Sequence, residues 1–350
     1  MLKTLSLLNN FSSKASALHI GDSAFSRVHK PAELTSLLKK KIPDSDQLIV
    51  KADMVSIEKI YPKNLDVLRC ITEAAKGKII VTEGHLLWRP RILEPDGLKL
   101  MADGVELDWN RLLEGRGWRW LLKNPDWGWF INGPHWSHLM KEDRLYLEKY
   151  GYLDLFKENG IEYVNATDEI WAGRVADPKI VKEAVESKYP PAAIEKVYGL
   201  VPEKLFRHRD STLISLSRRK EYPSLTMKNM FGLTPDPVRA WWHGFRNRRL
   251  DDSILDMNRV YGALFNLMGI FEATRGDGPT PFTRDIGISN SMAQLDAIIC
   301  QVAGFDLGKM LYISSGNNIF GTYSAELLND AKSKLEGWFP APIEGLREPI

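Results

Sequence analysis

Ionisable side chains stand at the ends of three short segments whose residue types predict β-strands. Lys51 ends an apolar segment, Glu83 ends a β-branched segment, and Glu272 lies near the end of a third. In parallel sheets, ligands bind beyond the carboxyl ends of the strands. The sequence therefore predicts a polar site at which lysines and carboxylates from distant segments meet.

A lysine-containing segment supplies the chemistry that we expect at this site. Lys220, Lys228 and Asn229 follow the strand predicted at 212–217. Several lysines in one place repel one another unless carboxylates or a bound anion balance their charge. A lysine crowded by like charge has a lowered pKa and can act as a base or a nucleophile. These residues therefore predict Lys/carboxylate acid–base chemistry on an acidic small molecule.

The candidate residues form two groups. The catalytic candidates are Lys228, Lys220, Glu83 and Glu272. Backbone N–H groups of a glycine-rich turn would help to hold the anion, and the substrate-binding candidates are Lys51, Thr82, Asn229, Thr274, Gly276, Asp277, Gly278 and Asp296. A structural interpretation stays open for some of them. Lys228 and Asn229 could merely cap a turn, and Asp296 could face the N-terminal end of a helix dipole.

Alternating strands and helices must position these residues. The strand at 47–51, the helix at 64–76 and the strand at 78–84 form a unit whose length implies parallel pairing and a right-handed crossover. The remaining pattern predicts strands at 161–164, 212–217 and 267–273, and helices at 139–159, 177–199, 255–267 and 291–302. The expected fold is therefore α/β, with a mostly parallel sheet and helices on both faces.

The stretch at 85–136 interrupts this alternation. It holds seven of the eleven tryptophans together with frequent glycine and proline. Because large aromatic side chains are usually buried, a packed subdomain is favoured over an aromatic lid above a substrate. The expected organisation is an N-terminal segment at 1–45, an α/β domain at 46–320 that contains this insertion, and a C-terminal tail at 321–350.

The overall charge argues against a general polyanion binder. The chain has 47 Lys and Arg against 45 Asp and Glu, a net charge of +2. Locally, however, residues 207–249 hold ten Lys or Arg and three Asp or Glu, interleaved with Trp241, Trp242, His243 and Phe245. We favour a carboxylate or phosphate pocket, or a solvated face, over nucleic acid, because no known nucleic-acid module is present.

A histidine pair raises the question of a metal. His135 and His138 are three residues apart, Glu142 lies four further on, and His85 is another candidate. On a helix such residues share a face, as metal ligands require. A His-x-x-His pair is common by chance, however, and we favour no metal.

Other cofactors and compartments are constrained by what the sequence lacks. Cys70 and Cys300 are the only cysteines, too few for a cysteine-ligated iron–sulfur cluster. The phosphate-binding loop of ATP sites and the glycine fingerprint of NAD sites are missing, so the cofactor stays unknown. With no apolar run of 18 residues and no proper signal peptide, we expect a cytoplasmic protein without a membrane partner. Homo-oligomerisation stays open.

Several motifs together resemble one known family. They are Ile49-Val50-Lys51, Ile80 to Gly84, Leu225-Thr226-Met227-Lys228-Asn229-Met230-Phe231-Gly232, Gly276 to Thr280, and Leu295-Asp296-Ala297 with Ala303-Gly304-Phe305. Over roughly residues 45–310 the chain is similar to a widespread prokaryotic domain-of-unknown-function family (number 362), whose members often carry ferredoxin-type iron–sulfur modules. The resemblance implies an α/β fold and supplies no reaction.

The chain departs from this family at several positions. Lys51-Ala52-Asp53 replaces the usual Lys-Pro-Asn, Tyr222 stands where a histidine is expected, and Glu272 replaces a frequent Asp. The ferredoxin cysteines are missing. These departures point to a divergent member, for instance one in a specialised biosynthetic pathway.

The function expected from the sequence is that of an enzyme acting on a carboxylate- or phosphate-bearing small molecule. The missing histidine leaves open a non-catalytic ligand-binding or partner protein derived from the family. The histidines leave open a metal-dependent enzyme.

Overall fold

One mixed sheet organises the part of the chain that the structure describes. The computed structural model describes residues 17–54, 65–85, 91–94, 97–102, 105–106, 123, 134–220, 224–236, 238–276 and 278–339. The strands of the sheet lie in the order β1-β2-β11-β10-β9-β3-β4-β8. Their bounds in that order are Leu18–Ile20, Ser23–Val28, Arg284–Ser289, Asn266–Thr274, Thr212–Arg218, Gln47–Lys51, Lys78–Glu83 and Glu162–Asn165.

The central part of this sheet is parallel. Strands β10, β9, β3, β4 and β8 pair with one another in parallel, whereas β1, β2 and β11 are joined by antiparallel pairings. The parallel pairing of β3 with β4 across a crossover is as predicted from the sequence. In the register of these strands, Lys51 lies opposite Thr82 and Ser215, and Arg218 lies opposite Glu272. The carboxyl ends of the parallel strands therefore share one edge.

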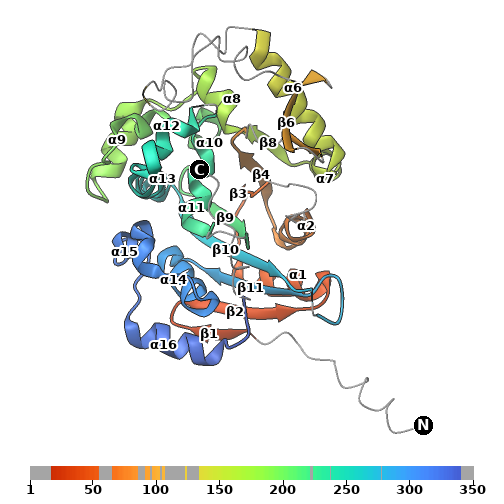
Figure 1. The fold of residues 1–350 in the computed structure, drawn as a ribbon, viewed down its shortest axis with the longest axis vertical. Helices are drawn as coiled ribbons and strands as arrows, with labels where there is room; N and C mark the ends of the chain where they lie inside the picture. The colour runs from red at the N-terminus through yellow and green to blue at the C-terminus, as the bar shows by residue number, and fades with distance from the viewer. Residues whose placement is uncertain are drawn as a thin grey trace, which may run out of the picture.

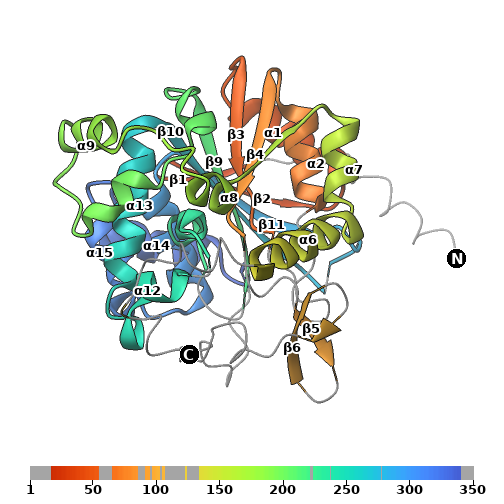
Figure 2. The same ribbon diagram turned by 90° about the horizontal axis from the view of Figure 1, so that it is seen from above.

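Helices cover both faces of the sheet, as Figures 1 and 2 show. One face packs against α1 (Pro31–Lys41), α2 (Leu65–Ala74), α6 (Pro134–Lys149) and α7 (Tyr152–Glu158). The other face packs against α9 (Pro178–Glu186), α11 (Thr226–Met230), α13 (Leu250–Leu264), α14 (Met292–Ala303) and α16 (Ala325–Lys334). The α/β fold with a mostly parallel sheet is confirmed.

Strand periodicity explains this two-sided core. Leu48 and Val50 of β3 join one apolar cluster, and Ile49 between them joins the other. Side chains alternate across a strand, so an uninterrupted apolar run fills both layers. Burying one such side chain contributes about 1.5–3 kcal/mol. Gly77 lets the chain enter β4 directly against the backbone of Ser45 and Asp46, where a Cβ would collide.

Some elements differ from the sequence expectation. The helix expected at 177–199 is α9 followed by a 3₁₀ turn, η1 (Glu195–Gly199), and α13 begins five residues before the expected 255. Strand β11 was not expected, and helix α11 within the lysine-containing segment was not expected either.

The expected boundaries at 45 and 320 do not separate units of the fold. Residues 17–45 form β1, β2 and α1, which belong to the main sheet and its layers. In the stretch assigned to a C-terminal tail, Leu328 and Ala331 of α16 are buried in the same apolar cluster as α14. In Figure 1, α16 lies beside β1 and α14 at the lower end of the molecule.

The described part of the tryptophan-rich insertion is a small second sheet. It consists of β5 (Arg91–Glu94), β6 (Gly97–Ala102) and β7 (Val105–Glu106). The tryptophan side chains of the insertion lie outside the described residues, so packed subdomain and aromatic lid both stay predictions. No described helix has the combination of length and apolar character that crossing a membrane requires.

Candidate functional site

Lys51 is the first member of a buried ionic cluster at the carboxyl edge of the sheet. It ends β3, and its side chain is 2 % exposed. Its ammonium contacts Glu83 Oε1 at 2.9 Å and donates to Asn229 Oδ1 at 2.8 Å and to the Ala52 carbonyl at 2.9 Å. These contacts use the three donors of the ammonium. Lys51 therefore ties β3 to β4 and to α11.

Glu83 is held from the other side by backbone groups. The Gly84 N–H donates to Oε1 at 3.0 Å, and the Met54 N–H donates to Oε2 at 3.2 Å. Both donors lie in the segments that leave β4 and β3, so the strand ends themselves orient this carboxylate. The result is a buried lysine–carboxylate pair with both partners fixed in position.

A second lysine–carboxylate pair lies beside the first. Asp53 Oδ2 is 2.7 Å from Lys220 Nζ and 3.9 Å from Nε of Arg218, which ends β9. All three side chains are at most 5 % exposed. Lys220 also donates to the Ser224 hydroxyl at 3.4 Å. The ends of β3 and β9 therefore bring one carboxylate together with two cations.

A third ion pair extends the cluster to β10 and β11. Glu272 Oε2 is 2.9 Å from Nε of Arg284, whose Nη2 is 3.3 Å from Asp66 Oδ2 on α2. Glu272 lies opposite Arg218 in the β9–β10 register, so this pair adjoins the second one. The carboxyl edge thus carries a continuous row of buried charges across four neighbouring parallel strands and β11.

Among the buried members of this row, cations outnumber carboxylates by one, and the exposed Asp66 beside Arg284 supplies a fourth carboxylate at the margin. The described buried members of the row are four cations and three carboxylates, namely Lys51, Arg218, Lys220 and Arg284 with Asp53, Glu83 and Glu272. An excess of buried positive charge favours the entry of an anion.

The pKa values of the buried groups shift in different directions. Burial lowers the pKa of Lys51 and of Lys220, although nearby carboxylates, chiefly Glu83 and Asp53 respectively, oppose the shift. Burial opposes ionisation of Asp53, but Lys220 and Arg218 outweigh it and the pKa of Asp53 is lowered. Burial raises the pKa of Glu272, and Arg284 offsets only part of this rise. Groups with shifted pKa values gathered at one edge are typical of functional sites.

Helix α11 presents Asn229 to the cluster. The Asn229 amide donates to the Lys51 carbonyl at 3.2 Å, the Ser215 hydroxyl at 3.0 Å and the Leu216 carbonyl at 3.1 Å. Its oxygen accepts from Lys51, so the amide bridges β3 and β9. The interpretation of Asn229 as a mere turn cap does not account for these contacts.

Asp296 on α14 anchors α11 from below. Its Oδ1 accepts from the Thr226 N–H at 2.9 Å and the Thr226 hydroxyl at 2.6 Å, and its Oδ2 accepts from the Met227 N–H at 2.8 Å. Burial raises the pKa of Asp296 to about 7, against the effect of these hydrogen bonds. Asp296 is completely buried under α11. Asp296 therefore positions α11, and the expected substrate contact stays a prediction.

Close backbone approach completes the site. A Cβ on Gly84 would collide with the Gly232 carbonyl, and a Cβ on Gly232 would lie 2.8 Å from Lys51 Nζ. Arg239 Nη2 donates to the carbonyls of His85 at 3.2 Å and Gly232 at 2.9 Å. The two glycines therefore allow the segment after α11 to lie directly against the Lys51–Glu83 pair.

Two other predicted residues, Thr82 and Lys228, lie outside the three ion pairs. The Thr82 hydroxyl donates to the Val164 carbonyl at 2.9 Å and so joins β4 to β8. Lys228 is half-buried next to Asn229. The pKa of His243 is lowered to about 4, mainly by burial and secondarily by the charges of Lys228 and Arg239. Lys228 therefore belongs to the neighbourhood of His243.

The glycine-rich turn is described only in part. Thr274 is half-buried at the end of β10, and Gly276 is exposed with open space around it. Gly278 packs so closely on Thr283 that a Cβ would collide. Asp277 lies outside the described residues, so anion binding by this turn stays a prediction.

The metal candidates are not tested by the described side chains. The side chains of His135, His138 and Glu142 lie outside the described part of α6. His85 is buried just after β4, and its backbone N–H donates to the Thr167 hydroxyl at 2.9 Å. Among the side chains that are described, no group of three or more His, Cys, Asp and Glu is arranged to hold a metal ion.

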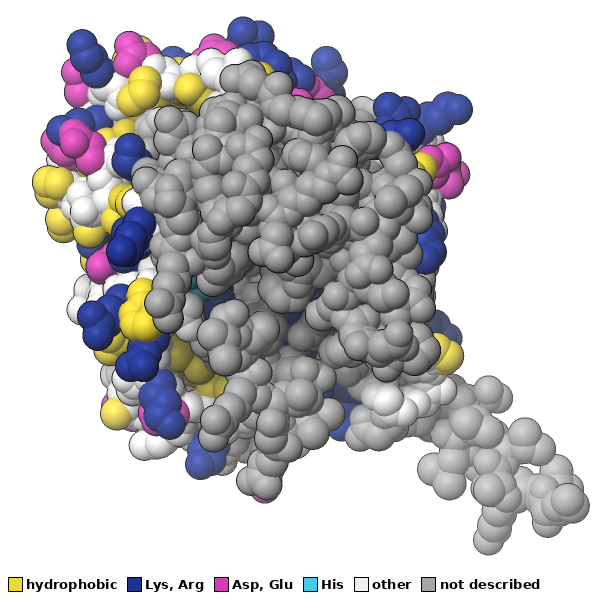
Figure 3. Space-filling model, turned by 45° about the horizontal axis from the view of Figure 1, so that its top comes forward, with side chains coloured by type: hydrophobic (Ala, Val, Ile, Leu, Met, Phe, Trp, Pro, Cys, Tyr) yellow, Lys and Arg dark blue, Asp and Glu magenta, His cyan; other side chains and the backbone are white. Residues whose placement is uncertain are grey.

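The basic residues of the span 207–249 lie partly in the buried cluster and partly on the surface. Arg218 and Lys220 enter the buried cluster, whereas Arg249 lies 4.3 Å over the Trp241 ring and Arg246 lies 5.3 Å over the exposed ring of Phe245. Figure 3 shows Lys and Arg side chains spread around the margin of one face, with Asp and Glu among them. The span is therefore partly a buried site and partly a solvated surface.

Sequence reasoning missed three members of the cluster. Asp53 follows Lys51 by two residues and Arg218 ends its strand, so the rule that pointed to Lys51 and Glu83 could have found both. Arg284 could not be found in this way, because β11 runs antiparallel and brings its first residue, not its last, to this edge.

The fold and the ionic row define an α/β protein with a polar site at the carboxyl edge of a mostly parallel sheet. Residues 213–301 match the model of the family described as Domain of unknown function (DUF362), which supports membership of that family for this part of the chain. The match spans β9 to α14 and includes Arg218, Lys220, Asn229 and Glu272. A search of curated proteins finds no match, and neither does a search of solved structures.

Proposed function

We propose that this protein is an enzyme that acts on a small molecule bearing a carboxylate or phosphate group, by acid–base chemistry of lysines and carboxylates. One observation carries the proposal. Two buried lysine–carboxylate pairs, Lys51–Glu83 at 2.9 Å and Lys220–Asp53 at 2.7 Å, lie side by side at the strand ends. Ligands of open α/β sheets bind at this edge.

The excess of positive charge supports binding of the acidic group. Arg218 presents a planar guanidinium, whose geometry suits carboxylate and phosphate oxygens. Lys220 contacts the same carboxylate as Arg218, that of Asp53, and supplies a point charge. We assign to these two residues the binding of the substrate anion, which would compete with Asp53 for them.

The Lys51–Glu83 pair suits proton transfer. The lowered pKa of Lys51 brings its neutral form closer to physiological pH, which is what a general base requires. Glu83 can take up or return the proton across 2.9 Å, and Asn229 holds the amine in place. Lys228 stays a candidate acid or base on the His243 side of the site.

A purely structural role for the row is a weaker explanation. Removing charged groups from water costs several kcal/mol for each ion, and buried ion pairs often stabilise a fold no better than apolar side chains. A sheet whose strand ends carry seven buried ionisable groups is therefore typical of a functional site.

Turnover of extracted metabolites tests the proposal. The protein is incubated with the anionic and the cationic fractions of a metabolite extract, and consumption and new products are followed by mass spectrometry. Wild type and the control Lys76→Met, whose side chain is 70 % exposed, should convert a compound of the anionic fraction. Lys220→Met should convert the same compound at least about 100-fold more slowly than wild type does. Retention of an anion without conversion would instead identify a binding protein, and conversion only of cationic compounds would overturn the proposal.

A further inference from the structure

A cavity lies at the opposite edge of the sheet from the ionic row. Its volume is about 350 Å³, and it is lined by Thr212 and Asn266, the first residues of β9 and β10, and by Asn290, which follows β11. Ligand pockets typically measure about 300–1,000 Å³. The cavity therefore suits a small ligand.

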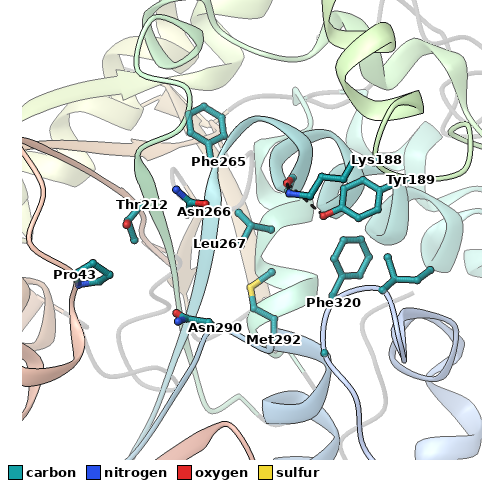
Figure 4. A pocket seen from close by; sticks show the side chains of 13 residues that line it. Pro43, Lys188, Tyr189, Thr212, Phe265, Asn266, Leu267, Asn290, Met292 and Phe320 are labelled. Carbon is teal, nitrogen blue, oxygen red and sulfur yellow. Dashed lines mark hydrogen bonds between the residues drawn. The ribbon is translucent and has the colours of Figure 1, made fainter.

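Apolar side chains form one part of the walls of this cavity, and polar groups form the rest. Figure 4 shows Leu267, Met292 and Phe320 around one space, with Lys188 and Tyr189 side by side at one end. Met292 and Phe320 are buried, and the ring of Tyr189 lies 5.5 Å from that of Phe320. Such walls favour an aliphatic or aromatic body in the ligand.

Lys188 supplies the single charge among the lining residues described. Its Nζ donates to the Gly262 carbonyl at 2.7 Å, and the Tyr189 hydroxyl donates to the same carbonyl at 3.3 Å. Lys188 is an exposed residue, and this carbonyl holds its ammonium at the end of the cavity while taking one of its three donors. None of the described lining residues is Asp or Glu, so the local charge is positive.

We propose that this cavity is a second ligand site, which binds a small amphiphile with one negative charge, its acidic head on Lys188 and its apolar body on Leu267, Met292 and Phe320. One ammonium matches one carboxylate, and a doubly charged phosphate would require more cations than the cavity offers. The site is separate from the ionic row, because it occupies the amino ends of β9 and β10.

Methyl resonances of methionine locate the ligand. Protein labelled with ¹³C-methyl methionine is titrated with octanoate, and with octanol and octylamine, which have the same chain length. Met292, assigned through Met292→Leu, reports this cavity, and Met230, the residue after Asn229 on α11, is chosen as the reporter for the ionic row. We expect octanoate to shift Met292 saturably without shifting Met230, and octanol and octylamine to bind at least about tenfold more weakly.

Two lysine variants test the role of charge. Lys188→Met removes the ammonium and keeps most of the side-chain stem, and it should lower the affinity for octanoate at least about tenfold. Lys179→Met, an exposed residue on α9, should leave binding unchanged. The proposal would be overturned if octanoate and octanol bind equally tightly, or if Lys188→Met binds octanoate with wild-type affinity. It would also be overturned if octanoate shifts only the Met230 resonance, or shifts no resonance at millimolar concentration. The readout does not depend on turnover, so failure here leaves the proposed enzyme function untouched.

Discussion

Breaking the Lys51–Glu83 pair should destabilise the protein in a strongly non-additive manner. With an effective dielectric constant of about 20, two unit charges at 2.9 Å attract by about 6 kcal/mol. Lys51→Met takes the neighbouring ammonium away from the buried Glu83 carboxylate, which keeps the N–H groups of Gly84 and Met54 as donors. Removal of one partner from a buried pair typically costs about 3–5 kcal/mol. We expect a loss of this size in the free energy of unfolding.

The neutral double variant should recover part of this loss. In Lys51→Met/Glu83→Gln neither side chain is charged, so no ion is left buried without its partner. The double variant should therefore be more stable than the sum of the single changes predicts, by about 2–3 kcal/mol. Urea unfolding of wild type, both single variants and the double variant gives this coupling energy.

An exposed ion pair provides the matched control. Lys76 and Asp44 lie 2.6 Å apart, and both side chains are 70 % exposed. Their coupling energy in the same experiment should not exceed about 1 kcal/mol, because solvent screens the pair. If the buried pair couples no more strongly than the exposed one, the description of Lys51 and Glu83 as a desolvated ion pair is refuted.

Two further perturbations test the support of the site. The pKa of Asp296 is raised to about 7 in the fold from 3.8, so its contribution to stability is fully present below pH 3.8 and is lost as the pH rises through 7. The stability of wild type relative to Asp296→Asn should therefore fall by about 2–3 kcal/mol between pH 5 and pH 8 in urea unfolding, and a flat difference would contradict the burial of Asp296. Gly84→Ala forces a Cβ onto the Gly232 carbonyl and should cost about 1–3 kcal/mol, whereas Gly276→Ala, with open space around it, should cost nothing measurable by thermal unfolding. Equal stability of these two variants would show that Gly84 and Gly232 are not in close contact.

The sequence was sufficient for the parallel strands and insufficient for the antiparallel ones. Apolar runs on β3, β4 and β9 are buried on both faces, so their composition alone predicts them. Strand β11 begins with Arg284 and Asp285 and contains a glycine, which argues against a strand locally. In the fold, Arg284 pairs with Glu272, and Asp285 pairs with Arg27 and Arg275. Partners that are distant in sequence therefore make this strand, and no local pattern records them.

The site was predictable to the extent that strand ends determine it. Lys51 and Glu83 end strands that pair in parallel, so their meeting follows from the topology. The roles of Asn229 and Asp296 depend on how α11 packs on β9 and α14, which a single sequence does not specify. For the same reason the support that Asp296 gives to α11 was not predictable, and a substrate contact by Asp296 stays a prediction.

The most direct test replaces the Lys220–Asp53 pair by neutral side chains. Asp53→Asn/Lys220→Met removes one charge of each sign, so the net charge of the row is unchanged. Stability and conversion of compounds in the anionic metabolite fraction are measured on the same preparation. We predict a free energy of unfolding within about 2 kcal/mol of wild type, together with loss of conversion. A variant that converts the same compound at the wild-type rate, or one that is unfolded, would contradict the claim that this ionic row serves chemistry on an anion.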